Sequence, residues 1–198
     1  MDPSLSKNYT EKYSATLPVE LRNFEAPNQL GNVENLDLRI FIKGPENNPK
    51  EVKIELQSEE DLFFHYVHYR NVDTFRDMQQ KHKLLIKLKD YPKLLQELLT
   101  NVISSPTMYI AVFYMDQEGL GRLDIVQNMS YKFMEVISCE FKISPDDIVR
   151  KNIIYRYNQQ VSLMRDTEEQ INEMEKLIRH RAAGLLPAVK KITKSTAK

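Results

Sequence analysis

The chain has 198 residues, of which 41% are hydrophobic and 28% are charged, and its formal net charge is zero. This composition is typical of one folded domain with appendages, and the zero net charge argues against a protein held to nucleic acid or membrane by its overall charge. Only five residues are glycine, which leaves little backbone for the loops that bind phosphate groups.

Cysteine content and apolar runs indicate the cell compartment in which the protein folds. The single cysteine, Cys139, cannot form a disulfide within the chain, which fits a reducing environment. Residues 1–35 contain no apolar run of the kind found in signal peptides. No stretch approaches the roughly 18 apolar residues that a membrane helix requires. We therefore expect a cytoplasmic protein with no membrane partner.

Residues 1–35 are rich in Asn, Ser, Glu and Pro and show no sustained period, so we expect a disordered N-terminal tail. The folded head is predicted to begin at Leu36. Hydrophobic residues alternate there as in a half-buried strand, at Leu36, Leu38, Ile40 and Ile42. A turn rich in Gly, Pro and Asn follows at residues 44–49. A second alternation then completes a hairpin, at Val52, Ile54 and Leu56.

Two helices are predicted in the middle of the chain. The aromatic-rich segment Phe63–Tyr69 predicts a third strand, and Asn71 can cap a short helix that runs to about Lys81. Another strand is predicted from the alternation of Leu84, Ile86 and Leu88. A second helix opens at residues 90–92, where Pro92 is tolerated near the helix start, and ends at residues 104–106.

Three more strands complete the predicted head. Two are separated by a turn at Gly119 and Gly121, and their alternating residues are Ile110, Val112, Tyr114, Leu123 and Ile125. The last strand is long, with Glu135 out of pattern among residues expected to share one face: Phe133, Ile137, Cys139, Phe141 and Ile143. About seven strands with an inserted helical pair predict an α+β head over residues 36–143, an antiparallel sandwich or barrel.

Residues 144–183 are predicted to form a dimerisation helix. Ser144 can cap it, Pro145 suits its first position, and Asp146 and Asp147 complement its dipole. Apolar residues then recur at the three- and four-residue steps of a coiled-coil seam: Ile154, Tyr157, Val161, Met164, Ile171 and Ile178. Two acids, Glu168 and Glu175, interrupt the seam and Met174 offers a competing register, so we expect a weak pair.

The chain ends in a basic tail, residues 184–198, which carries Lys190, Lys191, Lys194 and Lys198. Such a tail usually serves solubility, and it can also bind acidic tails on a filament surface or nucleic acid.

The remaining candidate sites favour structural roles. His65 and His68 lie three residues apart on a predicted strand and point to opposite faces, so they do not form a metal site. Cys139 falls on a core face with no neighbouring base. The acidic run at residues 59–61 is typical of a solvated loop, and Gly119-Leu120-Gly121 of a hairpin turn. We therefore expect no catalytic site, cofactor or metal.

Tyr131 lies between two apolar strands, close to Asn128, a residue type frequent in turns. An aromatic residue at a loop tip can fold back onto its own core. It can also anchor a partner, because tyrosine is enriched at binding hot spots. Periodicity alone favours the first of these two roles.

Three ordered blocks carry a family resemblance: Asp61–Tyr66, Leu84–Leu99 and Leu123–Tyr131. Together they resemble the head domain of spindle assembly abnormal protein six, the scaffold of the centriolar cartwheel. The resemblance implies a β-rich head followed by a parallel coiled-coil dimer. It also implies a head–head interface in which the residue at position 131 enters an apolar pocket of a neighbouring head. Where the family has Pro-Phe, this chain has Ser130-Tyr131, whose hydroxyl needs a partner if buried.

This resemblance implies a structural subunit of a centriole, basal body or related apical cytoskeletal structure, either the cartwheel protein or its shorter "like" relative. The partners that it implies are other copies of the chain, together with other centriolar or microtubule-associated proteins. The alternative is a DNA end-joining scaffold, because such proteins share the head-plus-coiled-coil architecture. An enzyme is disfavoured, because the sequence offers no nucleophile–base pair, metal set or phosphate loop.

Overall fold

The computed structural model describes residues 2–27 and 29–181. The chain divides into two compact units, Met1–Asn152, here called the head, and Ile153–Lys198. The last two residues of the expected dimerisation helix, 182–183, and the basic tail, 184–198, lie outside the described residues. Within those residues, no helix combines the length and the apolar character needed to cross a membrane.

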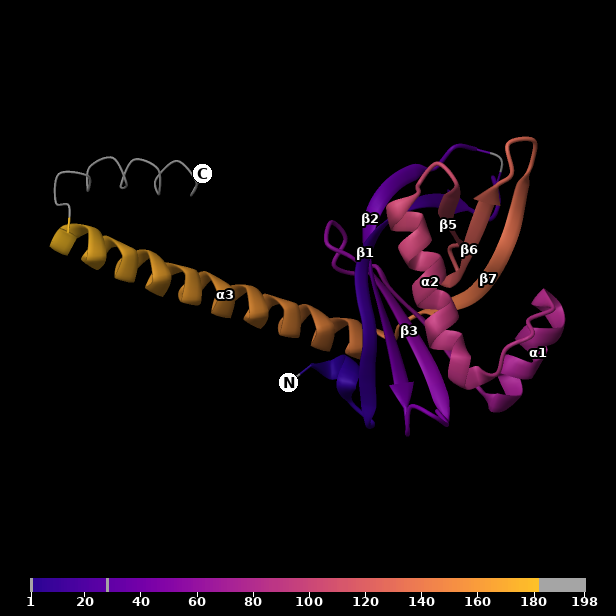
Figure 1. Ribbon diagram of the computed structural model, residues 1–198, viewed down its shortest axis with the longest axis horizontal. Helices are drawn as coiled ribbons and strands as arrows, with labels where there is room; N and C mark the ends of the chain where they lie inside the picture. Colours follow the sequence, from indigo (N-terminus) through magenta and orange to yellow (C-terminus); the bar gives the residue numbers. More distant parts are fainter. Residues whose placement is uncertain (1, 28, 182–198) are drawn as a thin grey trace. The chain divides into compact units, whose positions relative to one another are not determined.

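Seven strands close into a barrel in the order β1-β2-β3-β4-β7-β6-β5 (Figure 1). The strands are β1 (Tyr9–Asn23), β2 (Asn32–Lys43), β3 (Glu51–Ser58), β4 (His65–Asn71), β5 (Tyr109–Met115), β6 (Leu120–Asn128) and β7 (Phe133–Ile143). The helices are α1 (Val72–His82), α2 (Tyr91–Ser104) and α3 (Asp146–Arg181), with short 3-10 turns η1 (Pro3–Leu5) and η2 (Leu88–Asp90). The predicted α+β, barrel-like head with an inserted helical pair is confirmed. Its strands are antiparallel except that β1 and β5 run parallel.

The expectation of a disordered tail over residues 1–35 is wrong, and the head therefore begins well before Leu36. Strand β1 pairs with β2 from Tyr9 to Leu21, and its residues Val19–Asn23 pair with β5 to close the barrel. Leu17 and Val19 point into the core and are fully buried. The apolar residues of β1 do alternate, at Tyr13, Ala15, Leu17, Val19 and Leu21, but Pro18 lies between two of them and proline is disfavoured inside a strand. Proline is tolerated in a strand at an edge position, where no ladder hydrogen bond is lost.

The strand expected at Leu84–Leu88 is also absent, and β1 takes its place among the seven. Leu88 belongs to η2, while Leu84 and Ile86 pack against the core from a loop. The loop satisfies its backbone locally, because Leu84 N–H donates to the Gln79 carbonyl and the Gln79 amide donates to the Ile86 carbonyl. Three alternating residues without a neighbouring strand do not form a sheet.

Strand β7 contains a β-bulge, which explains why Glu135 interrupts the predicted alternation of apolar residues. Ile125 on β6 faces Ile137, but the next residue, Val126, faces Glu135, so Val136 is the extra residue of the bulge. The bulge changes which side chains point inward. Ile137, Cys139 and Phe141 are buried as expected, whereas Phe133, before the bulge, is 66% exposed.

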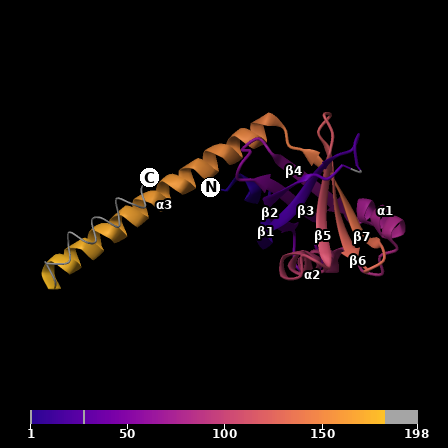
Figure 2. The ribbon, with the colours of Figure 1, turned by 90° about the horizontal axis from the view of Figure 1, so that it is seen from above.

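Helix α2 covers the part of the barrel that the β1–β5 pairing leaves open. That pairing spans five residues of β1, and α2 contacts β1, β2 and β5 alongside it (Figures 1 and 2). The buried face of α2 is Tyr91, Leu95, Leu98, Leu99 and Val102. Helix α1 starts with a capping box in which Asn71 and Thr74 bind each other's backbone N–H, as expected from Asn71.

A buried ion pair lies on the outer face of β3 and is covered by the N-terminus. The Lys53 ammonium lies 2.6 Å from Glu55 Oε1 and donates to the Ser4 carbonyl at 2.7 Å. The Ser4 hydroxyl donates to Glu55 Oε2 at 2.6 Å. The ammonium also lies over the Phe41 ring, 4.4 Å from its centroid. Every charge in this cluster has a partner, which is what a buried pair requires. Residues before β1 thus belong to the fold.

Leu17→Ala tests whether β1 is part of the core. Because Leu17 is fully buried, we expect its truncation to lower the free energy of unfolding by about 2–5 kcal/mol, measured by chemical denaturation. Ser14→Ala, on the exposed face of the same strand, should change it by less than about 0.5 kcal/mol. Equal stability of the two variants would mean that residues 1–23 do not fold.

Candidate functional site

The two histidines of β4 point to opposite faces of the sheet, as expected. Both side chains are buried and hydrogen-bonded. His65 lies opposite Gln57 on the outer face, and its Nδ1 is 2.8 Å from the Ser144 hydroxyl. The Asn152 amide donates to His65 Nε2 at 3.1 Å. Within residues 2–27 and 29–181, no group of three or more His, Cys, Asp or Glu is placed to hold a metal.

His68 belongs to a chain of hydrogen bonds through the core. Its Nδ1 lies 2.7 Å from the Glu140 carbonyl, so this nitrogen carries the proton. Its Nε2 therefore accepts from the Tyr91 hydroxyl at 3.1 Å, and the Cys139 thiol, 3.3 Å away, donates to the Tyr91 oxygen. This series of hydrogen bonds ends on the backbone carbonyl of Glu140, so each of its polar atoms has a hydrogen-bond partner within the protein.

Burial fixes the protonation of all three side chains. Desolvation lowers the pKa of His68 to about 3, with the nearby Arg70 charge acting in the same direction. Burial raises the pKa of the Cys139 thiol to about 11 and that of Tyr91 well above its usual value. At neutral pH the histidine is neutral and the thiol is protonated. The thiolate needed for nucleophilic chemistry does not form, so this chain of groups is structural.

The acidic run and the glycine pair lie in turns. The Ser58 hydroxyl accepts the N–H groups of Glu60 and Asp61 at 3.0 and 3.1 Å. Gly119 has φ +83°, which favours glycine, and a Cβ at Gly121 would lie 2.4 Å from the Phe113 ring. The turn and the packing of Phe113 thus account for the two glycines.

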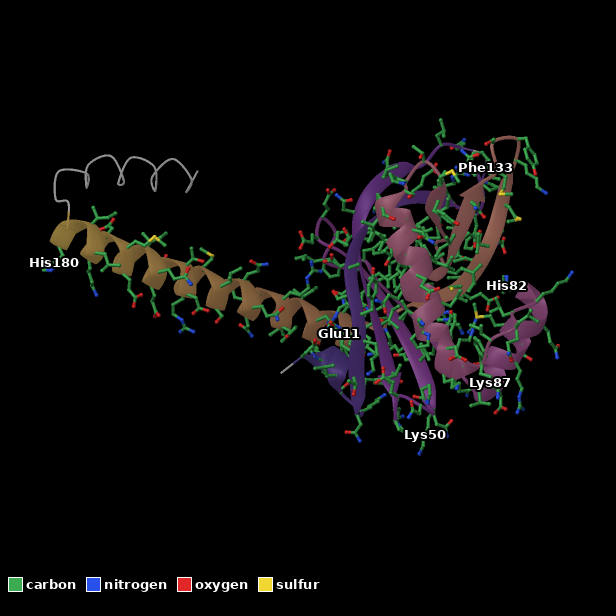
Figure 3. The ribbon with its side chains drawn as sticks, viewed as in Figure 1. Glu11, Lys50, His82, Lys87, Phe133 and His180 are labelled. Carbon is green, nitrogen blue, oxygen red and sulfur yellow. The ribbon has the colours of Figure 1, made fainter. Side chains whose placement is uncertain are left out.

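Tyr131 lies at the tip of the β6–β7 loop and does not fold back onto its own core. The loop turns sharply, because Met129 N–H donates to the Lys132 carbonyl and Ser130 adopts φ +65°. Tyr131 is 80% exposed, and Phe133 and Met134 are exposed beside it. Figure 3 labels Phe133 at this end of the hairpin. We call Tyr131, Phe133 and Met134 the hairpin tip.

Helix α3 carries a second exposed apolar surface. The seam residues Ile154, Tyr157, Val161 and Met164 are all exposed, whereas Ile171 and Ile178 are partly buried. A rival stripe is exposed one position earlier in the heptad, at Leu163, Met174 and Leu177. The helix thus offers two neighbouring stripes for pairing, of which the seam has more apolar positions.

The head matches a known family. The family model described as the SAS-6 N-terminal domain, from centriolar SAS proteins, matches residues 11–141. The chain belongs to this family. The match begins inside β1, which agrees with a head that includes the N-terminal strand. No curated protein sequence matches the chain.

Solved SAS-6 structures share this fold. A Leishmania SAS-6 N-terminal fragment with part of its coiled coil has 17% identity and a TM-score of 0.71, and the alignment covers 87% of this chain and 99% of that one. The coiled-coil dimer of C. elegans SAS-6 has 16% identity, a TM-score of 0.64 and coverage of 85% and 99%. A Drosophila melanogaster Sas-6 fragment dimerised via its coiled coil has 12% identity, a TM-score of 0.69 and coverage of 100% and 97%.

Sequence reasoning placed Tyr131 at a loop tip of this SAS-6 head but missed Phe133 and Met134. Phe133 was assigned to the core because it keeps an odd-numbered alternation with Ile137. Glu135, a charged residue within that alternation, was the available signal of the bulge that turns Phe133 outward.

The low pKa of His68 predicts a specific pH dependence of stability. Between about pH 6.5 and 3 the unfolded state binds a proton at this histidine that the folded state does not. This part of the stability is therefore complete above pH 6.5 and is lost as the pH falls, with a slope of up to about 1.4 kcal/mol per unit. His68→Gln retains a donor and an acceptor, and its unfolding free energy should vary less with pH over this range.

Chemical denaturation at half-unit pH steps measures both slopes. His180→Gln, an exposed position on α3, is the control and should behave as the unmodified chain. Identical pH dependence in all three proteins would contradict a neutral, buried His68.

Proposed function

We propose that the chain is a structural self-assembly subunit of a centriolar cartwheel, basal body or related apical cytoskeletal structure. The observation that carries this proposal is the exposed Tyr131 at the hairpin tip of a head that belongs to the SAS-6 family. An exposed aromatic side chain on a rigid β-hairpin suits an anchor that enters a pocket of a second head. Membership of a centriolar family supports the cytoskeletal location.

The second contact in this proposal is the seam of α3. The C. elegans and Drosophila relatives are coiled-coil dimers, and the same mode is proposed for this chain. Tyr157, Val161 and Met164 supply the central apolar positions, while Glu168 and Glu175 weaken the distal half. A pair held by so few apolar layers associates weakly and depends on the other contact.

Two different two-fold contacts on one subunit give continued growth. A head–head contact and a helix–helix contact alternate along the assembly, and the angle between them decides between a closed ring and a filament. Each contact can be weak, because linking several raises the effective concentration of the next. This logic supports assembly from interfaces too small to hold an isolated dimer.

Tyr131→Glu tests the head–head contact. A charge without a partner in an apolar pocket should weaken association beyond the dimer at least tenfold, measured by sedimentation of the full chain over a concentration range. Because Tyr131 is exposed, the melting temperature should stay within about 2 °C. Tyr131→Phe should associate as well or better, since it removes a hydroxyl that needs a partner.

Gln117→Glu, an exposed position in the β5–β6 turn, is the matched charge control and should assemble normally. A stable Tyr131→Glu protein that still assembles would place the head–head interface elsewhere.

Val161→Glu tests the seam. A carboxylate at a central seam position should weaken the helix-mediated dimer at least tenfold without changing the melting temperature of the head. Asn158→Glu, outside both stripes, should dimerise normally. Leu163→Glu separates the two registers. If it abolishes the dimer while Val161→Glu does not, pairing uses the rival stripe of Leu163, Met174 and Leu177.

A further inference from the structure

A groove of about 300 Å³ lies where the start of α2 meets β1 and the β2–β3 turn. Lys12, Lys89 and Lys93 line it together with the apolar parts of Tyr13, Ile42 and Pro92. We call this the lysine groove. The hairpin tip and the α3 seam contribute no residue to it.

The lysine groove has more positive than negative charge. Glu46 is its one acidic lining residue, and it pairs with Lys12 at 2.9 Å. Lys89 and Lys93 make no ion pair within the described residues, and neither do the neighbouring Lys83 and Lys87. Residues 81–93 contain five lysines and one acidic residue, Asp90. Of these five, Lys81 pairs with Glu140 at 3.0 Å, whereas the two that line the groove, Lys89 and Lys93, have no carboxylate partner among the described residues.

The wall of the groove formed by β1 is a segment of that strand with no partner strand on one side. Strand β1 pairs with β5 only from Val19 onward, so residues 9–18 have no strand partner on that side. Lys12 and Tyr13, which line the groove, belong to this segment, and the bulge between Glu11 and Tyr13 lies there too. Helix α2, rather than a strand, packs along this side of β1, so the groove lies between a strand and a helix.

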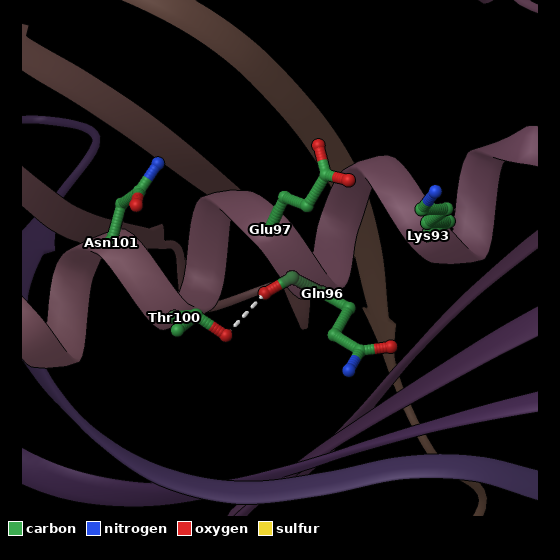
Figure 4. Close-up of a pocket in the computed structure, with 5 residues that line it drawn as sticks. All are labelled: Lys93, Gln96, Glu97, Thr100 and Asn101. Carbon is green, nitrogen blue, oxygen red and sulfur yellow. Dashed lines mark hydrogen bonds between the residues drawn. The ribbon is translucent and has the colours of Figure 1, made fainter.

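Helix α2 continues the surface beyond the groove. Lys93 and Gln96 also line a second hollow, of about 310 Å³, with Glu97, Thr100 and Asn101 (Figure 4). In Figure 4 the Gln96 side chain points to one side of the helix, while Glu97 and Asn101 point to the other. The Gln96 side therefore joins the lysine groove, and the Glu97 carboxylate faces away from it. Glu97 lines the second hollow with Lys93 and Gln96 but does not line the lysine groove.

We infer that the lysine groove is a docking site for an extended acidic peptide with an apolar side chain between its carboxylates. The lysines match the carboxylates, and the apolar lining matches the inserted side chain. The 14 residues of α2 span about 20 Å, which corresponds to about six residues of extended peptide. Nucleic acid fits less well, because phosphates use the charge of the groove but not its apolar lining.

The test uses the full chain and a fluorescein-labelled peptide of eight glutamates with one central leucine. Fluorescence anisotropy at low salt should detect binding, and raising the salt should weaken it. Lys89→Glu/Lys93→Glu should weaken binding at least tenfold. Lys142→Glu/Lys176→Glu changes the net charge equally at exposed positions outside the groove and should bind within about twofold of the unmodified chain. Lys89→Gln/Lys93→Gln should give an intermediate loss, and unchanged melting temperatures show that the variants fold.

Two further probes decide the chemistry of the occupant. A peptide with serine in place of the leucine should bind several-fold more weakly, and a ten-nucleotide single-stranded DNA should bind more weakly still. Equal losses in the two charge-reversal pairs, equal binding of the serine peptide, DNA binding as tight as the peptide, or no binding would each overturn the inference. Tyr131→Glu should leave peptide binding unchanged, so this variant separates peptide binding from the proposed head–head contact.

Discussion

The fold depends on closure of the barrel by its first strand. β1 pairs with β2 along most of its length and then with β5 over Val19–Asn23, which joins the first strand to the second half of the sheet. Because this closing contact is short, α2 must cover the remaining opening with its apolar face. Of the two helices inserted between β4 and β5, α2 thus completes the barrel where β1 has no pairing with β5. The lysine groove lies at the same junction, between β1 and the start of α2.

Much of this architecture follows from local pattern. The β2–β3 hairpin alternates cleanly because one face is core and the other is polar, and α1 and α2 carry clear start signals. Strand β1 was not predicted although its apolar residues alternate from Tyr13 to Leu21, because Pro18 and the polar composition of residues 1–35 favour a disordered segment. The Leu84–Leu88 segment was misassigned because a loop that packs on a core through alternate residues has the same short-range pattern as a strand.

The surfaces proposed for binding were predictable to different degrees. Tyr131 could be placed at a loop tip from its position between two strands, but whether it packs inward depends on the turn at Ser130 and on the bulge at Val136. The seam of α3 is periodic and can be read directly from its spacing. The lysine groove could not be found this way, because Lys12 and Lys93 are far apart in the chain and only barrel closure brings them together.

The hydrogen-bond chain through Cys139, Tyr91 and His68 has a practical consequence. The chain holds a single thiol, and that thiol is buried, protonated and bonded. Because it is 1% exposed, a thiol reagent reaches it only when the core around it opens, so its modification rate measures the opening of the barrel rather than the chemistry of the cysteine. The protein thus contains its own reporter of core opening, on β7. Comparing the modification rate in free and assembled protein would show whether assembly rigidifies the head.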